Sequence, residues 1–172
     1  MLLKYLYLFV LSATYFIGVF VGVQNALLLK GDCITSEENN LEIDMIYSQE
    51  PFQRFLSIAS NNALISLKNI LFGIFSLGIF PIACTFYNGA IFGSVLGNCI
   101  KFLPLNIILK STLPHCAEIV GVIMSGYIGF IISIRLIFKI KVYDNKRIVI
   151  LTLITFAIIL ISALIESYVS MS

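Results

Sequence analysis

Residues 5–29, with the sequence YLYLFVLSATYFIGVFVGVQNALLL, form an uncharged run of 25 residues near the start of the chain. An α-helix needs about 20 apolar residues to cross the hydrocarbon core of a bilayer, so this run is long enough to span a membrane. It is also longer than the roughly 7–15 apolar residues at the centre of a cleavable signal peptide. The run therefore predicts a first transmembrane helix that is not removed by cleavage.

The composition of the whole chain extends this conclusion. Of its 172 residues, 59% are hydrophobic and 12% are charged, and the mean hydropathy is +1.01. A typical globular protein is about 45–50% apolar and about 25% charged, so the chain lacks the charge that a soluble surface or a disordered segment requires. Its net charge of +2 gives no basic face, so we exclude nucleic acid as a partner. We expect residues 1–172 to form one integral membrane domain, an all-α bundle in the lipid bilayer.

Four further apolar segments complete a prediction of about five transmembrane helices. Pro81, close to Gly78, marks a bend between the second and third helices. Pro114 is expected in the first turn of the fourth helix. Residues 102–113 are expected to form an interfacial or partly re-entrant connection. Together with residues 5–29, the predicted spans are 55–80, 81–102, 114–138 and 148–168.

The placement of charged residues predicts how the bundle is oriented. The short loop 139–147 and its flank carry five bases, and Lys4 precedes the first helix, whereas the loop 31–54 carries six acids and one base. Bases concentrate in cytoplasmic loops of membrane proteins. We therefore place the N-terminus and loop 139–147 in the cytoplasm and the acidic loop outside, in a multi-pass protein of the cytoplasmic membrane. Lys101 and Lys110 fall on the outer side, against this rule.

Sequence patterns typical of catalysis or metal binding are absent. The four cysteines (Cys33, Cys84, Cys99 and Cys116) lack the paired spacing of metal ligands, and the last three fall in apolar segments where a thiol packs as a small hydrophobe. The chain contains no hydrolase nucleophile motif, zinc-protease motif or phosphate-binding loop. We therefore expect no enzymatic activity, no metal and no cofactor.

Small residues recur at intervals of four in three of the predicted helices. Such spacing places them on one helix face, where two backbones can approach closely. Packing between helices of one chain is the simplest interpretation, and contact within a homo-oligomer or a backbone-lined path are the alternatives. The residues assigned to helix packing are Gly89, Gly93 and Gly97 in the third helix and Gly121 and Gly129 in the fourth, with Gly18 and Gly22 in the first.

Polar side chains inside these apolar helices are the candidates for a site, because they are costly in hydrocarbon and need partners. Asn62, Ser66 and Asn69 form one stripe along the second helix, and His115 and Glu118 lie on one face of the fourth. His115 and Glu118 could pair with each other and with the helix end, or could serve an ion, a proton or a partner. We predict that one polar cluster near the outer surface contains Asn61, Asn62, Asn88, His115, Glu118 and Glu166.

Three groups of residues follow one another in an order found in a known family. The first is Asn61-Asn62 with Gly73, Gly78, Asn88-Gly89 and Gly93. The second is Leu113-Pro114-His115 with Glu118, Gly121, Gly126 and Gly129, and the third is the closing sequence ALIESYV at 163–169. Together, from about Phe55 onward, they resemble the stage II sporulation protein M family. The chain departs from the family pattern at Cys116, where glycine is usual, and in a spacing between His115 and Glu118 that is one residue shorter.

This resemblance implies a multi-span protein of a prokaryotic cytoplasmic membrane with no established catalytic activity. It also implies one of two contexts. The founding member of the family acts with cell-wall-degrading partners in a membrane complex during spore engulfment. Other compact members accompany genes for circular bacteriocins and assist peptide maturation, export or immunity beside ATP-driven transporters.

Two functional hypotheses follow from the residues and the resemblance. The first is a non-enzymatic component of a membrane complex, whose partners are an ATP-driven transporter, a cell-wall hydrolase complex or further copies of itself. The alternative is a transporter or channel subunit, in which His115 and Glu118 line a path for an ion, a proton or a peptide. An intramembrane enzyme is the least favoured, because no nucleophile and base can be paired in the sequence.

Overall fold

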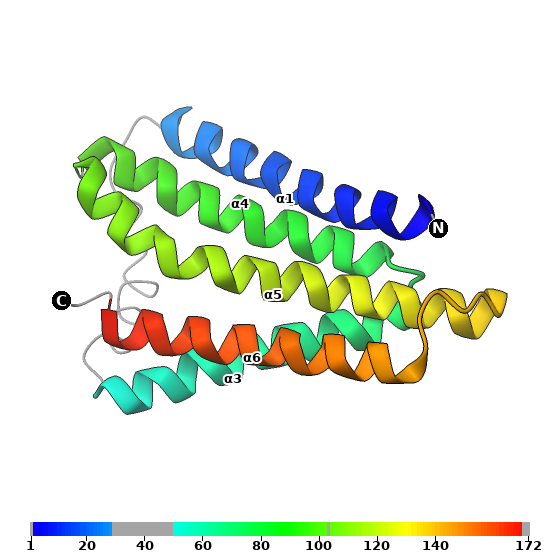
Figure 1. Ribbon diagram of the computed structural model, residues 1–172. Helices are drawn as coiled ribbons and strands as arrows, with labels where there is room; N and C mark the ends of the chain where they lie inside the picture. Colours follow the sequence, from blue (N-terminus) through cyan, green and yellow to red (C-terminus); the bar gives the residue numbers. More distant parts are fainter. Residues whose placement is uncertain (1, 29–49, 103, 170–172) are drawn as a thin grey trace.

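The computed structural model describes residues 2–28, 50–102 and 104–169, so most of the acidic loop lies outside the described residues. Within these ranges the chain forms long α-helices joined by turns, which confirms the predicted all-α membrane bundle (Figure 1). Five helices are long and apolar enough to cross a membrane. They are α1 (Leu2–Leu28), α3 (Pro51–Phe75), α4 (Ile79–Phe102), α5 (Leu105–Phe138) and α6 (Asn145–Val169).

The helices α3, α4, α5 and α6 run alternately in opposite directions, and the N-terminus lies at the same end of the bundle as the α5–α6 turn (Figure 1). A contact joins the two features at that end, because the ammonium nitrogen of Lys4 lies 4.8 Å from the ring centroid of Tyr143. The basic loop and the basic N-terminal residue thus share one end of the bundle. This is the placement that the charge pattern of the sequence requires for a common cytoplasmic side.

The turn between α3 and α4 lies slightly earlier than expected. α3 ends at Phe75 and α4 begins at Ile79, so the predicted boundary at 80–81 is a few residues late and Pro81 belongs to the first turn of α4. Gly78 makes the reversal possible, because its φ of +86° is strained for any residue with a Cβ. Its amide donates to the carbonyl of Gly73 at 2.9 Å, which closes the end of α3.

A side chain from α1 holds this turn in place. The hydroxyl of Tyr7 donates a hydrogen bond of 2.8 Å to the carbonyl of Gly78, and the Tyr7 ring stacks on Phe130 of α5 with centroids 3.7 Å apart. Tyr7, Leu11, Tyr127 and Ile131 form a buried hydrophobic cluster beside it. The end of the bundle that carries the N-terminus is therefore closely packed.

The fourth membrane helix starts earlier than predicted. Helix α5 begins at Leu105 and continues through Pro114, so most of residues 102–113 belong to this helix and the prediction that it starts at Pro114 is wrong. The 34 residues of α5 would extend about 50 Å at 1.5 Å per residue, more than the roughly 30 Å of hydrocarbon. The part suited to a span is Cys116–Phe138. The N-terminal part runs in a different direction from the rest (Figure 1), as a proline inside a helix causes.

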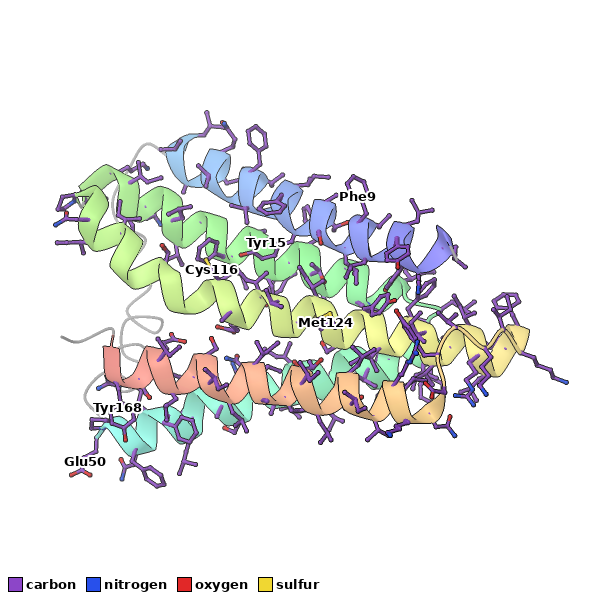
Figure 2. All side chains as sticks on the ribbon, in the orientation of Figure 1. Phe9, Tyr15, Glu50, Cys116, Met124 and Tyr168 are labelled. Atoms are coloured by element: carbon purple, nitrogen blue, oxygen red, sulfur yellow. The ribbon has the colours of Figure 1, made fainter. Side chains whose placement is uncertain are left out.

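The bundle is organised around α5. α1 packs mainly against α4, whereas α3 and α6 pack against α5 and against each other. The exposed residues are largely apolar and suit a lipid-facing surface, as Phe9 illustrates by pointing away from the bundle (Figure 2). Tyr15, on the same helix, points inward and is 5% exposed. The space between the α1–α4 pair and α5 is where the candidate site lies.

Candidate functional site

Glycines bring α1 and α4 into backbone contact. A Cβ built on Gly93 would lie 2.1 Å from the carbonyl oxygen of Val19, and one on Gly89 would lie 2.4 Å from that of Tyr15. Gly22 of α1 is equally restricted, because its Cβ would lie 2.1 Å from the carbonyl oxygen of Ala90. The glycines of both helices therefore face each other within one chain, as small residues do in membrane helix pairs.

Gly18 and Gly97 lie in the same α1–α4 seam, whereas Gly121 and Gly129 lie in α5. A Cβ on Gly129 would lie 2.7 Å from the carbonyl oxygen of Ile70, so this glycine allows α5 to approach the backbone of α3. A Cβ on Gly121 would lie 2.6 Å from the side chain of Ile159 in α6. α5 thus uses its glycines toward both of these neighbours.

The polar stripe of α3 faces the interior of the bundle. Asn62, Ser66 and Asn69 are all buried. The amide nitrogen of Asn69 lies 3.4 Å from the hydroxyl of Ser125 and 3.5 Å from the carbonyl oxygen of Val122, so the stripe joins α3 to α5. This seam is polar, whereas the α1–α4 seam is built from glycine.

The six residues of the predicted polar cluster are divided among several places. Asn61 is exposed on α3, whereas its neighbour Asn62 belongs to the buried stripe. Glu166 is half-buried on α6, away from the cavity described below. His115 lies in α5, but its side chain lies outside the part of the structure that is described. Asn88 and Glu118 are brought together, because both line the same cavity.

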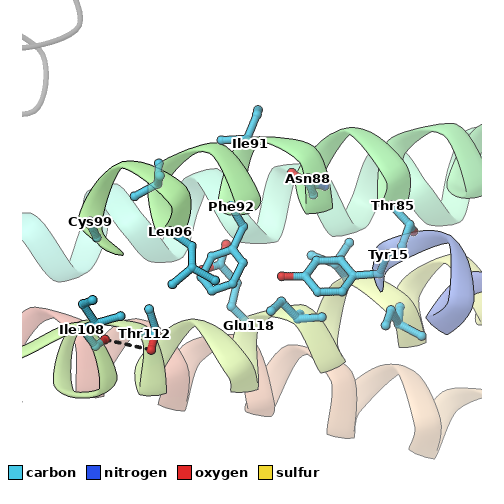
Figure 3. Close-up of a pocket in the computed structure, with 14 residues that line it drawn as sticks. Tyr15, Thr85, Asn88, Ile91, Phe92, Leu96, Cys99, Ile108, Thr112 and Glu118 are labelled. Carbon is cyan, nitrogen blue, oxygen red and sulfur yellow. Dashed lines mark hydrogen bonds between the residues drawn. The ribbon is translucent and has the colours of Figure 1, made fainter. Parts of the chain in front are cut away.

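This cavity, which we call the α4–α5 cavity, has a volume of about 380 Å³ (Figure 3). It is bounded by Tyr15 of α1, by one face of α4 and by α5 on both sides of Pro114. Ile91 and Val95 are exposed, so the cavity opens at the surface of α4. Its remaining walls are formed mainly by apolar side chains, namely Phe92, Leu96, Ile108, Ile119, Val122 and Ile123.

Polar groups lie within these apolar walls. The hydroxyl of Tyr15 points along the cavity toward Phe92 and Glu118 (Figure 3), and within the described part of the chain it is buried without a hydrogen-bond partner. Thr85 is fully buried, and its hydroxyl also lacks a partner. The amide nitrogen of Asn88 lies 3.6 Å from the sulfur of Cys84, one turn earlier in α4. The cavity therefore offers unused hydrogen-bonding capacity beside a carboxyl group.

The cavity ends where the closely packed part of the bundle begins. Ile123 lines the cavity and also packs against the buried cluster of Tyr7, Leu11, Tyr127 and Ile131. Leu11 of this cluster is completely buried. The cluster therefore forms a floor on the side of the N-terminus, and the space above it has the form of a binding pocket.

Tyr15 and Thr85 are site residues that sequence reasoning missed. Both lie in apolar helices where an aromatic ring or a threonine is ordinary, since a threonine hydroxyl can bond to its own helix. The three-residue and four-residue spacing of Thr85, Asn88 and Phe92 in α4, continued by Cys99, was the available signal. It places these residues along one side of the helix, but it does not identify the helix that they face.

Lys101, which violates the charge rule, has a structural role. Its ammonium group donates a hydrogen bond to the carbonyl oxygen of Ala26. This carbonyl belongs to the last turn of α1, where backbone acceptors are unpaired and a positive charge is favourable. The lysine therefore stabilises the end of α1 from the neighbouring helix α4.

Metal-binding chemistry was also considered for the described residues. In residues 2–28, 50–102 and 104–169, no three His, Cys, Asp or Glu side chains come together as a metal site requires. Glu118 is the one carboxyl group among the residues that line the cavity. The chemistry offered here is therefore that of binding through apolar contact, hydrogen bonds and one acidic group.

Comparison with known proteins identifies the family. The sequence profile described as stage II sporulation protein M matches residues 6–171. No curated protein and no solved structure matched the chain. The matched region covers nearly all of the sequence and includes nearly the whole of every membrane-spanning helix of the described structure. The chain therefore belongs to the stage II sporulation protein M family.

Proposed function

We propose that this protein is a non-enzymatic component of a complex in the cytoplasmic membrane, and that it holds an apolar segment of a partner in the α4–α5 cavity. The observation that carries this proposal is the cavity itself, which has about 380 Å³ of space and apolar walls within the membrane-spanning region. Sites for small ligands or side-chain anchors are typically apolar clefts of about 300–1,000 Å³ with a few polar groups. The α4–α5 cavity has these properties.

The shape of the cavity favours binding over conduction. A channel needs a continuous path, whereas the cluster of Tyr7, Leu11, Tyr127 and Ile131 fills the bundle beyond Ile123. The opening beside Ile91 and Val95 instead gives access from the lipid-facing surface of α4. A partner that lies in the same membrane can reach this opening without crossing the bilayer.

Two physiological contexts are compatible with this role through the family. In one, the protein assembles with envelope-remodelling enzymes during sporulation. In the other, it assembles with an ATP-driven transporter in the maturation, export or immunity of a bacteriocin. The identity of the neighbouring genes separates the two, because wall hydrolases would indicate the first context and a bacteriocin precursor with an ATPase the second.

Site-directed photo-crosslinking in cells of the source organism tests the proposed role. A photo-reactive residue at Val95, on the rim of the cavity, is expected to crosslink to one membrane protein. The same residue at Leu164, exposed on α6, serves as the control. Filling the cavity by Cys99→Phe is expected to remove the crosslink at position 95. Equal crosslinking patterns at 95 and 164, or no effect of Cys99→Phe in a folded protein, would contradict the proposal.

Reconstitution into liposomes tests the alternative of a transporter or channel subunit. The purified protein is expected to leave proteoliposomes tight to ions and protons, because the cavity has a floor. A pH-dependent flux that Glu118→Gln abolishes would instead favour the transport hypothesis. Glu166→Gln is the matched control, since Glu166 is half-buried on α6 and does not line the cavity.

A further inference from the structure

The hydrogen-bonding groups of the α4–α5 cavity indicate the chemistry of its ligand. Tyr15 is 5% exposed and Thr85 is fully buried, yet neither hydroxyl has a hydrogen-bond partner among the described residues. Buried polar groups in proteins are almost always paired, because an unpaired one in a medium without water is costly. The Tyr15 hydroxyl points along the cavity, so it indicates a ligand that supplies its missing partner there (Figure 3).

The acidic residue of the cavity selects the charge of that partner. Glu118 lines the cavity from α5, and in Figure 3 the hydroxyl of Tyr15 points toward it. An acidic residue inside a membrane pairs with a positive group and disfavours a negative one. A primary ammonium group has three donors and no acceptor. Its donors match the carboxyl group of Glu118 and the hydroxyl oxygen of Tyr15, which lie on the same side of the Tyr15 ring (Figure 3).

The apolar walls select the remainder of the ligand. Phe92, Leu96 and Ile119 are among the apolar side chains that line the cavity. Its volume of about 380 Å³ lies near the lower end of the range for ligand pockets, so it suits one unbranched chain rather than a two-chain lipid. Lysine in membrane proteins behaves in the same way: its alkyl stem lies along apolar surface and its charged group lies at the end.

We propose that the α4–α5 cavity binds an alkylammonium group, with the ammonium between Tyr15 and Glu118 and the alkyl chain against the apolar wall. This inference deepens the proposed function and rests on it for the choice of site. The ammonium group can belong to a single-chain amphiphile or to a lysine in the membrane segment of a partner. The chemistry recognised by the cavity is the same in both cases.

The absence of tryptophan from the chain provides a direct binding assay. Phe92→Trp places a single fluorophore in the wall of the cavity, and a brominated single-chain alkylamine quenches it on contact. The purified full-length chain in nanodiscs of phosphatidylcholine is titrated with the amine and with brominated alcohol and carboxylic acid of equal length. The matched reporter is Phe75→Trp, which is exposed at the end of α3 and reports only partition into the bilayer.

Saturable quenching of the Phe92→Trp reporter by the amine is expected, at concentrations about tenfold lower than for the alcohol, because hydrogen bonds to a charged group are the stronger ones. Glu118→Gln is expected to remove this preference while the alcohol still binds, which shows that the cavity is intact. Glu166→Gln is expected to leave the preference unchanged. Equal binding of amine and alcohol in the cavity with Glu118 present, or equal effects of the two glutamine variants, would overturn the proposal. If Phe92→Trp does not fold, Ile91→Trp at the rim replaces it.

A second arm identifies the source of the ammonium group. A hydrophobic transmembrane peptide with one central lysine is added as a competitor, and the same peptide with glutamine is the control. Displacement of the amine by the lysine peptide alone supports recognition of a lysine, and no displacement by either supports a free amphiphile. Displacement by both peptides equally would contradict recognition of the ammonium group. If the amine does not bind but position 95 still crosslinks to a partner, this inference is overturned and the proposed function stands. If the amine binds but position 95 does not crosslink to a partner, the proposed function is overturned and the ligand chemistry stands.

Discussion

The two sides of α4 differ in what they place against a neighbouring helix. Toward α1, Gly89 and Gly93 leave no space for even one additional carbon atom. Toward α5, larger side chains such as Phe92 and Leu96 border a cavity of about 380 Å³. The same helix is therefore in backbone contact on one side and held apart on the other. Small residues produce the tight seam, and bulky residues separate the helices and produce the pocket.

The two sides of α4 therefore serve different purposes: the side toward α1 contributes to stability, and the side toward α5 is available for binding. Helices in a membrane associate through close packing and polar contacts rather than through the hydrophobic effect. The α1–α4 seam provides the close packing, and the Asn69–Ser125 contact provides polar attachment between α3 and α5. The α4–α5 cavity provides neither, because the hydroxyls of Tyr15 and Thr85 are unpaired. We expect substitutions at the seams to change stability and substitutions in the cavity to change binding.

The largest effect is expected for Gly93→Leu in the α1–α4 seam. The new side chain would collide with the backbone of Val19, which cannot move without separating the two helices. We expect a loss of about 3 kcal/mol or more, at the upper end of overpacking, measured as a large fall in the thermal unfolding midpoint in detergent. Leu71→Ala, on the exposed side of α3, is the control, because its side chain faces away from every seam. Similar midpoints for the two variants would show that close packing in the α1–α4 seam does not make a large contribution to stability.

A smaller loss is expected for Asn69→Leu in the seam between α3 and α5. The substitution keeps the number and branching of the side-chain heavy atoms and removes the contacts to Ser125 and Val122. Hydrogen bonds between membrane helices average about 0.6 kcal/mol and reach about 1.7 kcal/mol, so we expect a loss within this range. Unfolding in mixed micelles with increasing denaturing detergent measures it. Asn61→Leu, on the exposed side of α3, should show no loss.

Two buried threonines sharpen the comparison between cavity and seam. Thr85 has an unpaired hydroxyl in the cavity wall, whereas the hydroxyl of Thr155 in α6 donates to the carbonyl of Leu151 at 2.8 Å. Thr85→Val is expected to leave stability unchanged or raise it by up to about 1 kcal/mol, because it removes an unsatisfied group. Thr155→Val is expected to lower stability by about 1 kcal/mol. The reverse order of unfolding midpoints would show that Thr85 is bonded in the folded protein.

The smallest effect is expected for Lys101→Gln. The lysine donates to the carbonyl of Ala26 at the end of α1, and a charge at a helix terminus contributes about 0.3–1 kcal/mol. We expect the free energy of unfolding to fall by an amount within that range. Added salt should make the difference between the two proteins smaller, because screening weakens the interaction of Lys101. Lys141→Gln, in the exposed turn between α5 and α6, is the comparison. If both variants unfold at the same temperature, the contact between Lys101 and the end of α1 does not contribute to stability.

The sequence predicts the membrane bundle because each helix carries its own signal. Length, hydropathy and the spacing of Gly89, Gly93 and Gly97 are local properties that a single segment reveals. The prediction that the fourth helix starts at Pro114 is wrong, because α5 begins at Leu105. A proline can also lie inside a membrane helix when neighbouring groups compensate for the lost hydrogen bond. In α5 the helix continues and changes direction.

The candidate site was predicted less completely, because it depends on which helices are neighbours. Asn61 and Asn62 are adjacent in the sequence, and adjacent helical residues point about 100° apart, so both could not join one cluster. Asn62 is buried on α3, whereas Asn88 lines the cavity from α4. Tyr15 reaches the site only because α1 pairs with α4 rather than with the next helix in the chain. Polarity in the sequence indicates which residues need partners, but the pairing of helices decides where the partners are.

That pairing also sets the order in which the protein can be assembled during synthesis. Lys101 and Ala26, which meet across the α1–α4 seam, are 75 residues apart in the chain. At about 5–20 residues per second, α1 waits roughly 4–15 s before the end of α4 has been made. Throughout that time the glycine face of α1 is in the membrane without its partner. Insertion of this protein therefore leaves the glycine face of α1 unpacked until α4, the third of the described membrane helices, has been made, and it leaves α3 waiting longer still for its main partners α5 and α6.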